Sequence, residues 1–454
     1  MKKTEPGSDP HILLVNPWIH DFAAYDVWAK PLGLLQLAAI LRLHGFRVSY
    51  VDCLDRFHPK GGHPPFPRAR QGRGPYLKTP VPNPPGLEDI PRTFSRYGIA
   101  PQWLSEDLAA LSPPDLVLVT SLMTYWYPGV AETIAVIRRA FPRAPILLGG
   151  IYATLCPDHA AACCGADRVV TGMAESAILS LAAEYTGRNP SLRFDPQNMD
   201  TWPYPALDLE RQIPHVPLLT SRGCPFSCDY CASGYINPVR MRRSPASVVE
   251  EIRYWHEAFG VIDFAFYDDA LLIDADRHVV PMLEQIVAAG LPVRFHTPNA
   301  LHIRRITAEV ARLMFAAGFA TLRLGLETTA ADRRRQMDGK VEQAEFVEAV
   351  AHLKRAGFTG DRIGAYLLAG LPGQPLAEVE ASIRLVRDCG ITPIPAYYTP
   401  IPHTAMWEKA KAASRYDLEK DPVFTNNAVC PCSKDPFSWA PLTRLKQLVR
   451  GDMP

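Results

Sequence analysis

The stretch Cys224-Pro225-Phe226-Ser227-Cys228-Asp229-Tyr230-Cys231 places three cysteines at C-x3-C-x2-C spacing, with an aromatic residue directly before the last one. Three thiolates on one short loop can bind three irons of a cubane cluster and leave the fourth iron open to a small chelating molecule. The alternatives are a structural zinc site, which needs four closed ligands, and a chance grouping of cysteines. The spacing and its context favour the cluster.

The chain around this loop alternates strand-like and helical segments. Val216-Pro217-Leu218-Leu219-Thr220 is typical of a strand and ends directly at the cysteine loop. Five further strand-like runs follow, at 261–267, 293–297, 321–326, 363–368 and 391–398. Helical segments separate them, for example 245–259, 308–317 and 342–356. Six β/α units predict a partial TIM-like barrel, with its active site at the carboxyl ends of the strands.

Polar residues or glycines follow several of these strands. The segments are Tyr267-Asp268-Asp269, Thr297-Pro298-Asn299, Gly325-Leu326-Glu327-Thr328 and Gly370-Leu371-Pro372-Gly373. Carboxylate and amide side chains can bind the polar groups of a ligand, so Asp269, Asn299 and Glu327 are candidate contacts. One such residue alone is more often a turn or capping residue. Their recurrence around one rim favours a binding site.

The amino-terminal part of the chain also alternates strands and helices. Strand-like runs occur at 11–17, 48–52, 116–120, 145–150 and 168–172. Helical segments include 31–41, 130–141 and 174–185. This alternation predicts a doubly wound, Rossmann-like parallel sheet that is covered on both faces. Ligands of such sheets bind at the carboxyl ends of the strands.

Three of these strand ends carry small or hydroxyl residues: Thr120-Ser121-Leu122, Gly149-Gly150 and Gly172. Glycines there let a bulky ligand approach the backbone, and a hydroxyl can bond to its polar edge. A Gly-Gly pair after a strand is common in itself, so this pattern alone leaves the ligand open.

The segment from Thr220 to Cys231 resembles the signature loop of the radical SAM superfamily, and the amino-terminal domain resembles the cobalamin-binding module. The chain is therefore similar to the cobalamin-dependent radical SAM enzymes, which implies a 4Fe-4S cluster, S-adenosylmethionine (SAM) and cobalamin as cofactors. The cluster ligands implied are Cys224, Cys228 and Cys231. The SAM contacts implied are Phe226, Tyr230, Asp269, Asn299, Glu327, Leu368 and Gly370. The cobalamin contacts implied are Thr120, Ser121, Leu122, Gly149, Gly150, Tyr152 and Gly172.

The activity that this resemblance implies is methyl transfer to an unactivated carbon, or to phosphorus, through a 5'-deoxyadenosyl radical. The substrate would be a small molecule or a peptide between the two cofactor sites, and the electron would come from a reducing partner such as flavodoxin or ferredoxin. A cyclase or rearrangement enzyme without methyl transfer is an alternative. A non-catalytic cobalamin sensor or carrier is another, but it leaves the cysteine loop without a purpose. A methylthiotransferase would carry a second cluster, which the spacing of Cys53, Cys156, Cys163 and Cys164 does not indicate.

One part of the cobalamin pattern is missing. Some cobalamin domains supply a histidine to cobalt from D-x-H-x-x-G after the first strand, where this chain reads Pro17-Trp18-Ile19-His20-Asp21. Asp55 to Gly61 is nearly that motif, but it has one residue too many and follows the second strand. We therefore treat His58 as a loop histidine and His20 as a poor candidate for a cobalt ligand.

The expected domains are a cobalamin-binding domain at 1–186, a linker at 187–215, a radical SAM domain at 216–405 and a carboxy-terminal extension at 406–454. An insertion at about 58–92 contains ten prolines, which exclude a helix or a central strand there. It is either a solvated loop or an ordered flap. The pair Cys430 and Cys432 is either a second metal or redox site or a plain loop feature.

Composition excludes several classes of protein. With 48 Lys and Arg against 47 Asp and Glu, the formal net charge of +1 offers no basic field for nucleic acid. No apolar run is long enough for a membrane span, and the polar amino terminus is unlike a signal peptide. A three-cysteine cluster loop with scattered further cysteines fits a reducing compartment, so a cytoplasmic location is expected.

Overall fold

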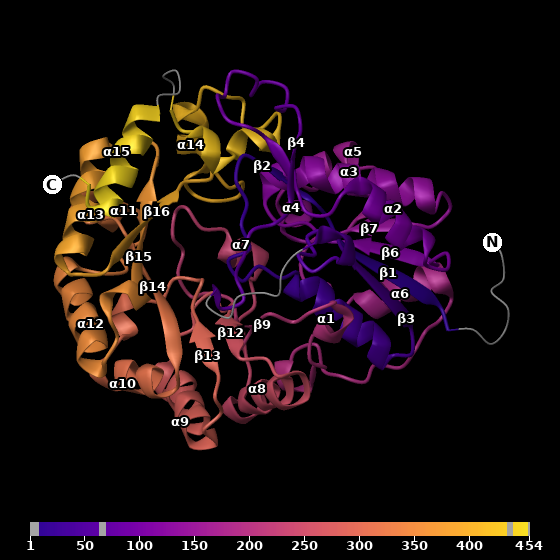
Figure 1. The fold of residues 1–454 in the computed structure, drawn as a ribbon, viewed down its shortest axis with the longest axis horizontal. Helices are drawn as coiled ribbons and strands as arrows, with labels where there is room; N and C mark the ends of the chain where they lie inside the picture. Colours follow the sequence, from indigo (N-terminus) through magenta and orange to yellow (C-terminus); the bar gives the residue numbers. More distant parts are fainter. Residues whose placement is uncertain (1–8, 63–69, 434–438, 453–454) are drawn as a thin grey trace. The chain divides into compact units, whose positions relative to one another are not determined.

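The computed structural model describes residues 9–62, 70–433 and 439–452. The chain divides into two compact units, Met1–Ile213 with Asp421–Val423, and Pro214–Lys420 with Phe424–Pro454 (Figure 1). Each unit is built on its own parallel sheet.

The sheet of the first unit has five parallel strands in the order β3-β1-β6-β7-β8. The strands are β1 (His11–Asn16), β3 (Arg47–Asp52), β6 (Leu116–Val119), β7 (Ile146–Leu148) and β8 (Arg168–Val169). This order confirms the predicted doubly wound sheet. The chain reverses its direction of travel across the sheet between β1 and β6, which is the position where ligands of such sheets bind.

Helices cover both faces of this sheet. They are α1 (Leu32–Leu43) and α6 (Ile178–Thr186) on one face, and α2 (Pro101–Ala109), α3 (Tyr127–Ala140), α4 (Ile151–Leu155) and α5 (Pro157–Cys163) on the other. Side chains of β1 alternate between the two cores: Ile12 and Leu14 pack toward α1 and α6, whereas Leu13 and Val15 pack toward α2 and α3. Since both faces are buried, the strand is a continuous apolar run.

The Pro-rich insertion at 58–92 is ordered over part of its length. A small antiparallel sheet has the strand order β2-β5-β4. Its strands are β2 (Ile19–Asp21), β4 (Lys78–Pro80) and β5 (Ser95–Tyr97). Tyr76 from the insertion packs with Tyr97 in a small apolar cluster, and Pro80 occupies the edge strand, where a proline costs no ladder bond. Residues 63–69 lie outside the described residues.

The segment that was expected to be a linker, 187–215, packs largely on the first unit. Phe194 and Ala206 belong to the apolar core beneath α1. The Ala206 N–H donates to the Leu35 carbonyl at 3.0 Å, and Gln36 Nε2 donates to the Pro203 carbonyl at 2.8 Å. The segment is rich in turn residues, which suggested a surface connection, yet its few apolar side chains anchor it.

The sheet of the second unit has six parallel strands in the order β16-β15-β14-β13-β12-β9. The strands are β9 (Val216–Leu218), β12 (Asp263–Phe266), β13 (Arg294–His296), β14 (Phe319–Glu327), β15 (Ile363–Ala369) and β16 (Thr392–Tyr397). A two-stranded ribbon, β10 (Ser221–Arg222) with β11 (Met241–Arg242), follows β9. Because each strand pairs with the next one along the chain, the predicted partial barrel is confirmed.

Helices connect these strands, and Figure 1 shows α8, α9, α10, α12 and α13 along the outer side of the sheet. The helices are α7 (Ser233–Ile236), α8 (Pro245–Phe259), α9 (Val279–Ala289), α10 (Ala308–Ala316), α11 (Ala331–Met337), α12 (Gln343–Ala356), α13 (Leu376–Asp388), α14 (Trp407–Ala413) and α15 (Trp439–Arg450). Four rings from three strands, Phe264, Phe266, Phe295 and Phe319, pack at centroid distances of 5.3 to 5.9 Å. This aromatic cluster fixes the relative height of β12, β13 and β14.

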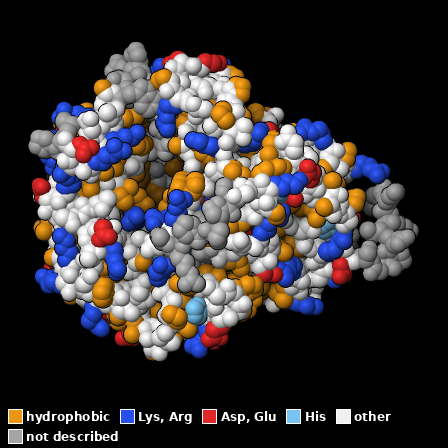
Figure 2. Space-filling view, viewed as in Figure 1, with side chains coloured by type: hydrophobic (Ala, Val, Ile, Leu, Met, Phe, Trp, Pro, Cys, Tyr) orange, Lys and Arg blue, Asp and Glu red, His pale blue; other side chains and the backbone are white. Residues whose placement is uncertain are grey.

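The surface carries both signs of charge. Figure 2 shows Lys and Arg side chains together with Asp and Glu side chains and scattered hydrophobic ones on one face, as the balance of 48 basic and 47 acidic residues predicts. Within the described part of the chain, none of the helices has the length and apolarity that crossing a bilayer requires.

Leu13 tests the packing of the first unit, because its side chain is fully buried between β1 and the α2–α3 layer. Replacement by alanine leaves a cavity, so we expect Leu13→Ala to lower the free energy of unfolding by about 2–5 kcal/mol in denaturant titration. Leu192→Ala is the matched control, since Leu192 is 53% exposed, and a change above about 1 kcal/mol there would contradict the packing described.

Candidate active site and cofactor sites

A cavity of about 790 Å³ lies in the second unit at the carboxyl ends of β12, β13 and β14. All three cysteines of the C-x3-C-x2-C loop line it, as do five of the predicted SAM contacts: Phe226, Tyr230, Asp269, Asn299 and Glu327. The volume falls within the range of small-molecule sites. The barrel topology therefore brings residues from distant parts of the sequence to one cavity.

Two consecutive carboxylates at the end of β12 hold the cysteine loop. Asp268 is 2% exposed and accepts hydrogen bonds from the backbone N–H and the hydroxyl of both Thr220 and Ser221, at 2.6 to 3.2 Å. Asp269 accepts from the Gly223 N–H at 2.9 Å. The predicted SAM contact Asp269 thus supports the loop directly before Cys224. Asp268 was not singled out from the sequence, although two adjacent acids at a strand end are a usable signal.

The donor set fits an iron–sulfur cubane better than a single ion. Among the residues that the structure describes, no three Cys, His, Asp or Glu side chains are grouped as ligands of one metal ion. Cys224, Cys228 and Cys231 instead share the wall of one cavity, which suits a cluster larger than one ion. Burial raises the pKa of the Cys228 thiol, and the Lys340 ammonium opposes that rise. A neighbouring cation of this kind would also stabilise a cluster-bound thiolate.

Lys340 belongs to a half-buried polar group next to the cluster loop. Its Nζ donates to the Tyr230 hydroxyl at 3.3 Å and lies 5.5 Å from the centre of the Tyr230 ring. The Tyr230 hydroxyl donates to Asp338 Oδ2 at 3.2 Å. Asp338 and Lys340 lie between α11 and α12, where no periodicity or motif singled them out in the sequence.

Glu327 lies at an irregular position of β14. The pairing of β14 with β15 shifts register between Gly325 and Glu327, and Glu327 has a φ of 63°. A non-glycine residue in this left-handed region costs about 1–3 kcal/mol, and such strain concentrates at functional sites. Burial raises the pKa of its carboxyl to about 7, although the nearby Lys340 lowers it. The carboxyl group can therefore change charge near neutral pH until a cationic ligand group fixes it as a carboxylate.

A histidine that the sequence analysis did not identify also lines the cavity. His302 stacks on Phe226 with ring centroids 4.8 Å apart. Burial lowers the pKa of His302 to about 4, so its ring is neutral at pH 7. Both ring nitrogens are buried and have no hydrogen-bond partner within the described residues. A bound ligand with polar edges would supply those partners, which supports a fit to SAM.

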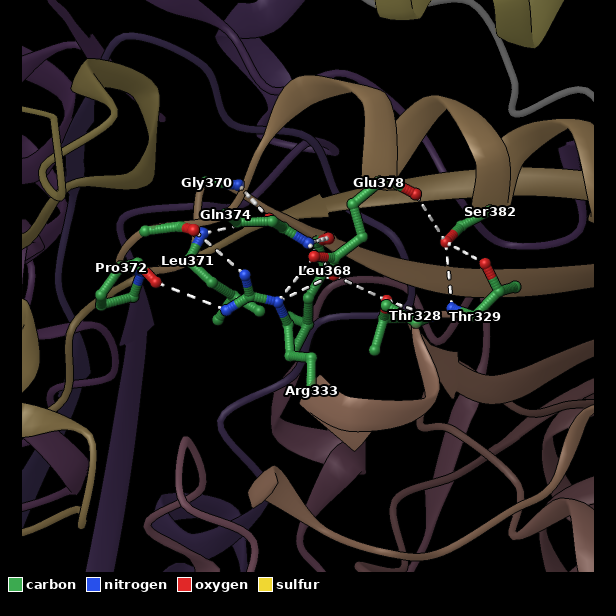
Figure 3. Close-up of polar contacts among 12 residues, drawn as sticks. Thr328, Thr329, Arg333, Leu368, Gly370, Leu371, Pro372, Gln374, Glu378 and Ser382 are labelled. Carbon is green, nitrogen blue, oxygen red and sulfur yellow. Dashed lines mark hydrogen bonds and ion pairs between the residues drawn. The ribbon is translucent and has the colours of Figure 1, made fainter. Parts of the chain in front are cut away.

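Two predicted SAM contacts, Leu368 and Gly370, are absent from the described wall of this cavity. Gln374 holds them instead, as Figure 3 shows: its Oε1 accepts from the N–H groups of Gly370 at 2.9 Å and Leu371 at 3.2 Å, and its Nε2 donates to the Leu368 carbonyl at 3.0 Å. One amide side chain therefore fixes the backbone at the end of β15.

Arg333 supports the same turn from the opposite side (Figure 3). Its Nε donates to both carboxylate oxygens of Glu378, at 2.8 and 2.9 Å, and its other two nitrogens donate to the carbonyls of Pro372 and Gly373. Glu378 also accepts from the Thr328 hydroxyl at 2.8 Å, directly after Glu327. Arg333 therefore joins the strand ends of β14 and β15.

In the first unit, the predicted cobalamin contacts lie on neighbouring loops at one edge of the sheet. Ser121 Oγ donates to the Gly149 carbonyl at 2.7 Å and accepts from the Ala153 N–H at 3.2 Å. Gly150 has a φ of 96°, and a Cβ there would lie 2.2 Å from the Ser121 carbonyl oxygen. The loops after β6 and β7 are thus locked together, and only glycine is compatible with the second position of the Gly-Gly pair.

The outer side of this edge is open and partly apolar. A Cβ at Gly172 would meet no atom within 4 Å, and Leu122 is 43% exposed. Tyr152, another predicted cobalamin contact, is not exposed at this edge. Its side chain is fully buried, and its hydroxyl forms a hydrogen bond with His159 Nδ1 at 2.7 Å. The open Gly172 and the exposed Leu122 fit a bulky, largely apolar group. Tyr152 lies in the core and supports the loop from inside.

The two histidines considered for cobalt have protein partners. His20 Nε2 lies 2.8 Å from Glu132 Oε2. His58 Nε2 lies 3.4 Å from Asp107 Oδ2, and its ring stacks on Trp103 at 4.9 Å. These contacts agree with the assignment of His58 as a structural loop residue and leave cobalt without an assigned protein ligand.

Among the described residues, no group of metal ligands includes Cys430 or Cys432. Cys432 packs in an apolar cluster with Tyr398 and Tyr230. Burial raises the pKa of the Cys432 thiol to about 12, so this side chain behaves as a small apolar residue.

Comparison with known proteins matches both units. Residues 218–386 match the model of the radical SAM superfamily, and residues 104–182 match the model of the B12 binding domain. The fold is similar to that of the radical S-adenosylmethionine methyltransferase TsrM from Kitasatospora setae, solved with cobalamin and a [4Fe-4S] cluster, with a TM-score of 0.66 at 19% identity, over 90% of this chain and 80% of that chain. At this identity the similarity establishes a shared fold.

Three sequence relatives agree with these matches. An uncharacterised methyltransferase of Pyrococcus horikoshii is 28% identical over 348 residues, which cover 69% of this chain and 74% of the relative. Cytidylyl-2-hydroxyethylphosphonate methyltransferase of Streptomyces wedmorensis is 21% identical, over 86% of this chain and 79% of the relative. Anaerobic magnesium-protoporphyrin IX monomethyl ester cyclase of Cereibacter sphaeroides is 25% identical, over 68% of this chain and 55% of the relative.

Asp268 tests how the cysteine loop is held. Asp268→Ala leaves the donors of Thr220 and Ser221 unpaired, so we expect a loss of about 3 kcal/mol or more of stability and little iron after anaerobic reconstitution. Asp276→Ala, on an exposed turn, should bind iron and sulfide like the wild type. Full iron content in Asp268→Ala would show that the loop does not depend on this carboxylate.

Glu327 predicts a pH dependence of stability. Its folded pKa of about 7 lies above the ordinary value of 4.5, so the folded state keeps a proton that the unfolded chain loses. The stability contributed by the protonated group is present below pH 4.5 and is lost as the pH rises through 7. In the cluster-free protein, Glu327→Gln should reduce this decline by up to about 3 kcal/mol. Glu348→Gln, on the exposed side of α12, should keep the wild-type slope, and an unchanged slope in Glu327→Gln would contradict the assignment.

Proposed function

We propose that this chain, which belongs to the radical SAM superfamily and carries a B12-binding domain ahead of its radical SAM domain, is an enzyme that transfers a methyl group to an unactivated carbon, or to phosphorus, of a small-molecule or peptide substrate. Its cofactors are a [4Fe-4S] cluster, SAM and cobalamin. The observation that carries the proposal is the cavity shared by the three loop cysteines and the strand ends of β12, β13 and β14.

The cysteine loop supplies the cluster ligands in this proposal. Cys224, Cys228 and Cys231 provide the three thiolates, and when bound the cluster and SAM supply the radical chemistry. The carboxylates of Asp268 and Asp269 hold the backbone on which these thiols are displayed. Because their hydrogen bonds are made by the protein alone, the loop is positioned before any cofactor binds.

The remaining wall of the cavity supplies partners for SAM. Glu327 offers a buried carboxyl group for the ammonium of SAM, and binding of that cation would keep the group ionised. His302 offers two unsatisfied ring nitrogens to the ribose or base, and its stacking on Phe226 holds the ring in place. Lys340 contributes positive charge near Cys228. The protein thus orients the ligand and excludes water, as expected where cofactors perform the chemistry.

The loops after β6, β7 and β8 hold cobalamin in this proposal. Ser121 locks the first two loops together, Gly172 leaves space along the backbone, and the exposed Leu122 provides apolar contact. All of these residues lie within the segment 104–182 that matches the B12 binding domain.

A second candidate activity is cyclisation or rearrangement without methyl transfer. The similarity to a protein named as an anaerobic cyclase favours keeping it. Two relatives of comparable or greater coverage are named methyltransferases, so methyl transfer is the preferred proposal.

Anaerobic reconstitution with iron, sulfide and hydroxocobalamin, followed by reduction in the presence of SAM, tests the proposal. A reduced one-electron carrier such as flavodoxin or ferredoxin supplies the electron. We expect 5'-deoxyadenosine from the wild type, measured by chromatography and mass spectrometry, and none from Cys228→Ala, which lacks one thiolate. Cys163→Ala, at an exposed thiol in the first unit, should retain the wild-type yield.

The products separate the candidate activities. Absence of 5'-deoxyadenosine from the wild type would remove radical chemistry, and its formation without cobalamin uptake would remove cobalamin-dependent methyl transfer. S-adenosylhomocysteine formed alongside 5'-deoxyadenosine supports methyl transfer over rearrangement. Formation of 5'-deoxyadenosine alone with a bound cobalamin would favour the cyclase-type alternative.

A further inference from the structure

A second cavity, of about 200 Å³, lies within the first unit at the carboxyl ends of β1 and β3. Asn16, at the end of β1, and Asp52, at the end of β3, line it together with Glu210. In the strand order, β3 and β1 lie on one side of the switch point, and β6, β7 and β8 lie on the other. None of the predicted cobalamin contacts is among the described residues that line this cavity. It is therefore separate from the loops that carry Ser121 and the glycines.

Acidic side chains outnumber basic ones around this cavity. The described lining contains five acidic residues and three basic residues, namely Asp26, Asp52, Asp55, Asp107 and Glu210, with Lys30, Arg56 and Arg211. Two buried ion pairs are included: Lys30 with Glu210 at 2.6 Å and Arg56 with Asp26 at 2.7 Å. Arg211 is shared by two carboxylates. Asp52 bonds to neutral groups, the Asn16 amide at 2.7 Å and the Leu54 N–H at 2.8 Å. Acidic residues therefore outnumber basic ones by two on the described wall. Burial raises the pKa of Asp26, Asp52 and Glu210, and a bound cation would favour their ionised forms.

Two buried polar atoms on the wall lack partners. Within the described residues, neither the Tyr50 hydroxyl oxygen nor Glu210 Oε1 makes a hydrogen bond, and both residues line the cavity. The Glu210 side chain is only 4% exposed. Buried polar groups are almost always satisfied in native proteins, so these two atoms indicate that something else completes the site.

The chemistry of the wall determines which ligand would fit. Glu210 Oε1 and the Asp52 carboxylate are acceptors, and the Tyr50 hydroxyl can accept as well. An anionic ligand would be opposed by the acidic excess, and no three side chains in the described part of the chain are grouped to bind a metal ion. The volume of about 200 Å³ equals that of about seven liquid water molecules at ~30 Å³ each. A compact cation with several N–H donors satisfies all of these conditions.

We propose that this cavity binds a small protonated amine, whose N–H groups donate to Glu210 Oε1, the Tyr50 hydroxyl and the Asp52 carboxylate. The site is independent of methyl transfer, since it uses no residue of the cluster cavity and none of the predicted cobalamin contacts. The buried pair Lys30–Glu210 fixes one acceptor in place, because Glu210 keeps its Oε2 on Lys30 and presents Oε1 to the cavity.

Calorimetric titration of the reconstituted, cobalamin-loaded protein tests this site, with 1,4-diaminobutane as the probe and 1,4-butanediol as its uncharged counterpart. We expect one diamine per chain, bound at least about tenfold more tightly than the diol, which corresponds to the removal of a charge-assisted contact. Asp52→Asn keeps the acceptor used by Asn16 and Leu54 but removes the charge, so it should weaken diamine binding about tenfold.

Tyr50→Phe distinguishes a ligand site from a merely structural cavity. Since the hydroxyl has no partner among the described residues, its removal should leave the melting temperature equal or higher. It should nevertheless weaken diamine binding about fivefold, as expected for one lost hydrogen bond. The matched control Glu184→Gln alters a 57% exposed carboxylate on α6 and should bind the diamine like the wild type.

Three results would overturn the proposal. The first is absence of diamine binding, or equal binding of diamine and diol, which would indicate a water-filled polar cavity. The second is wild-type affinity in both Asp52→Asn and Tyr50→Phe. The third is binding that occurs in cobalamin-free protein and disappears on cobalamin loading, because the cavity would then belong to the cobalamin site.

Discussion

The carboxylate of Asp268 is the constraint on which the active-site cavity depends. Buried at the end of β12, it accepts four hydrogen bonds from Thr220 and Ser221, while the adjacent Asp269 accepts from Gly223. These hydrogen bonds fix the backbone of the loop that follows β9, and the three cysteines lie on that loop. A buried carboxylate is costly unless its oxygens are saturated with donors, and here the donors are the backbone of the loop itself.

The same principle operates at the end of β15 and in the first unit. Gln374 and Arg333 satisfy the backbone at the end of β15, and Ser121 ties the loop after β6 to the loop after β7. Backbone N–H and C=O groups beyond the end of a strand lose their partners in the sheet, and in each case a side chain supplies the hydrogen bonds instead. Rigid loops of this kind allow cofactors to be oriented without a large ordering cost.

Sequence periodicity predicted the architecture because strands that are buried on both faces are continuous apolar runs in the sequence. The five strands of the first sheet, the six of the second and the location of the cysteine loop all follow from apolar runs, breakers and spacing. Lys340 and His302, which line the cavity, and Asp338, which accepts from Tyr230, were not predicted, since they lie on loops whose meeting is determined by tertiary packing. The packing of 187–213 on α1 was missed for a related reason: a few apolar side chains, such as Phe194, anchor a segment whose composition is that of a turn-rich connection. Leu368 and Gly370 were expected at the cavity, but the structure shows only that Gln374 fixes their backbone.

The central claim is that the cavity next to Cys224, Cys228 and Cys231 holds a [4Fe-4S] cluster with one iron open to SAM. Electron paramagnetic resonance of the reconstituted, reduced protein, recorded before and after addition of SAM, tests it most directly. The account predicts the signal of a single reduced cubane whose g-values shift when SAM binds the open iron. A spectrum that SAM leaves unchanged, or the absence of any cubane signal, would contradict it.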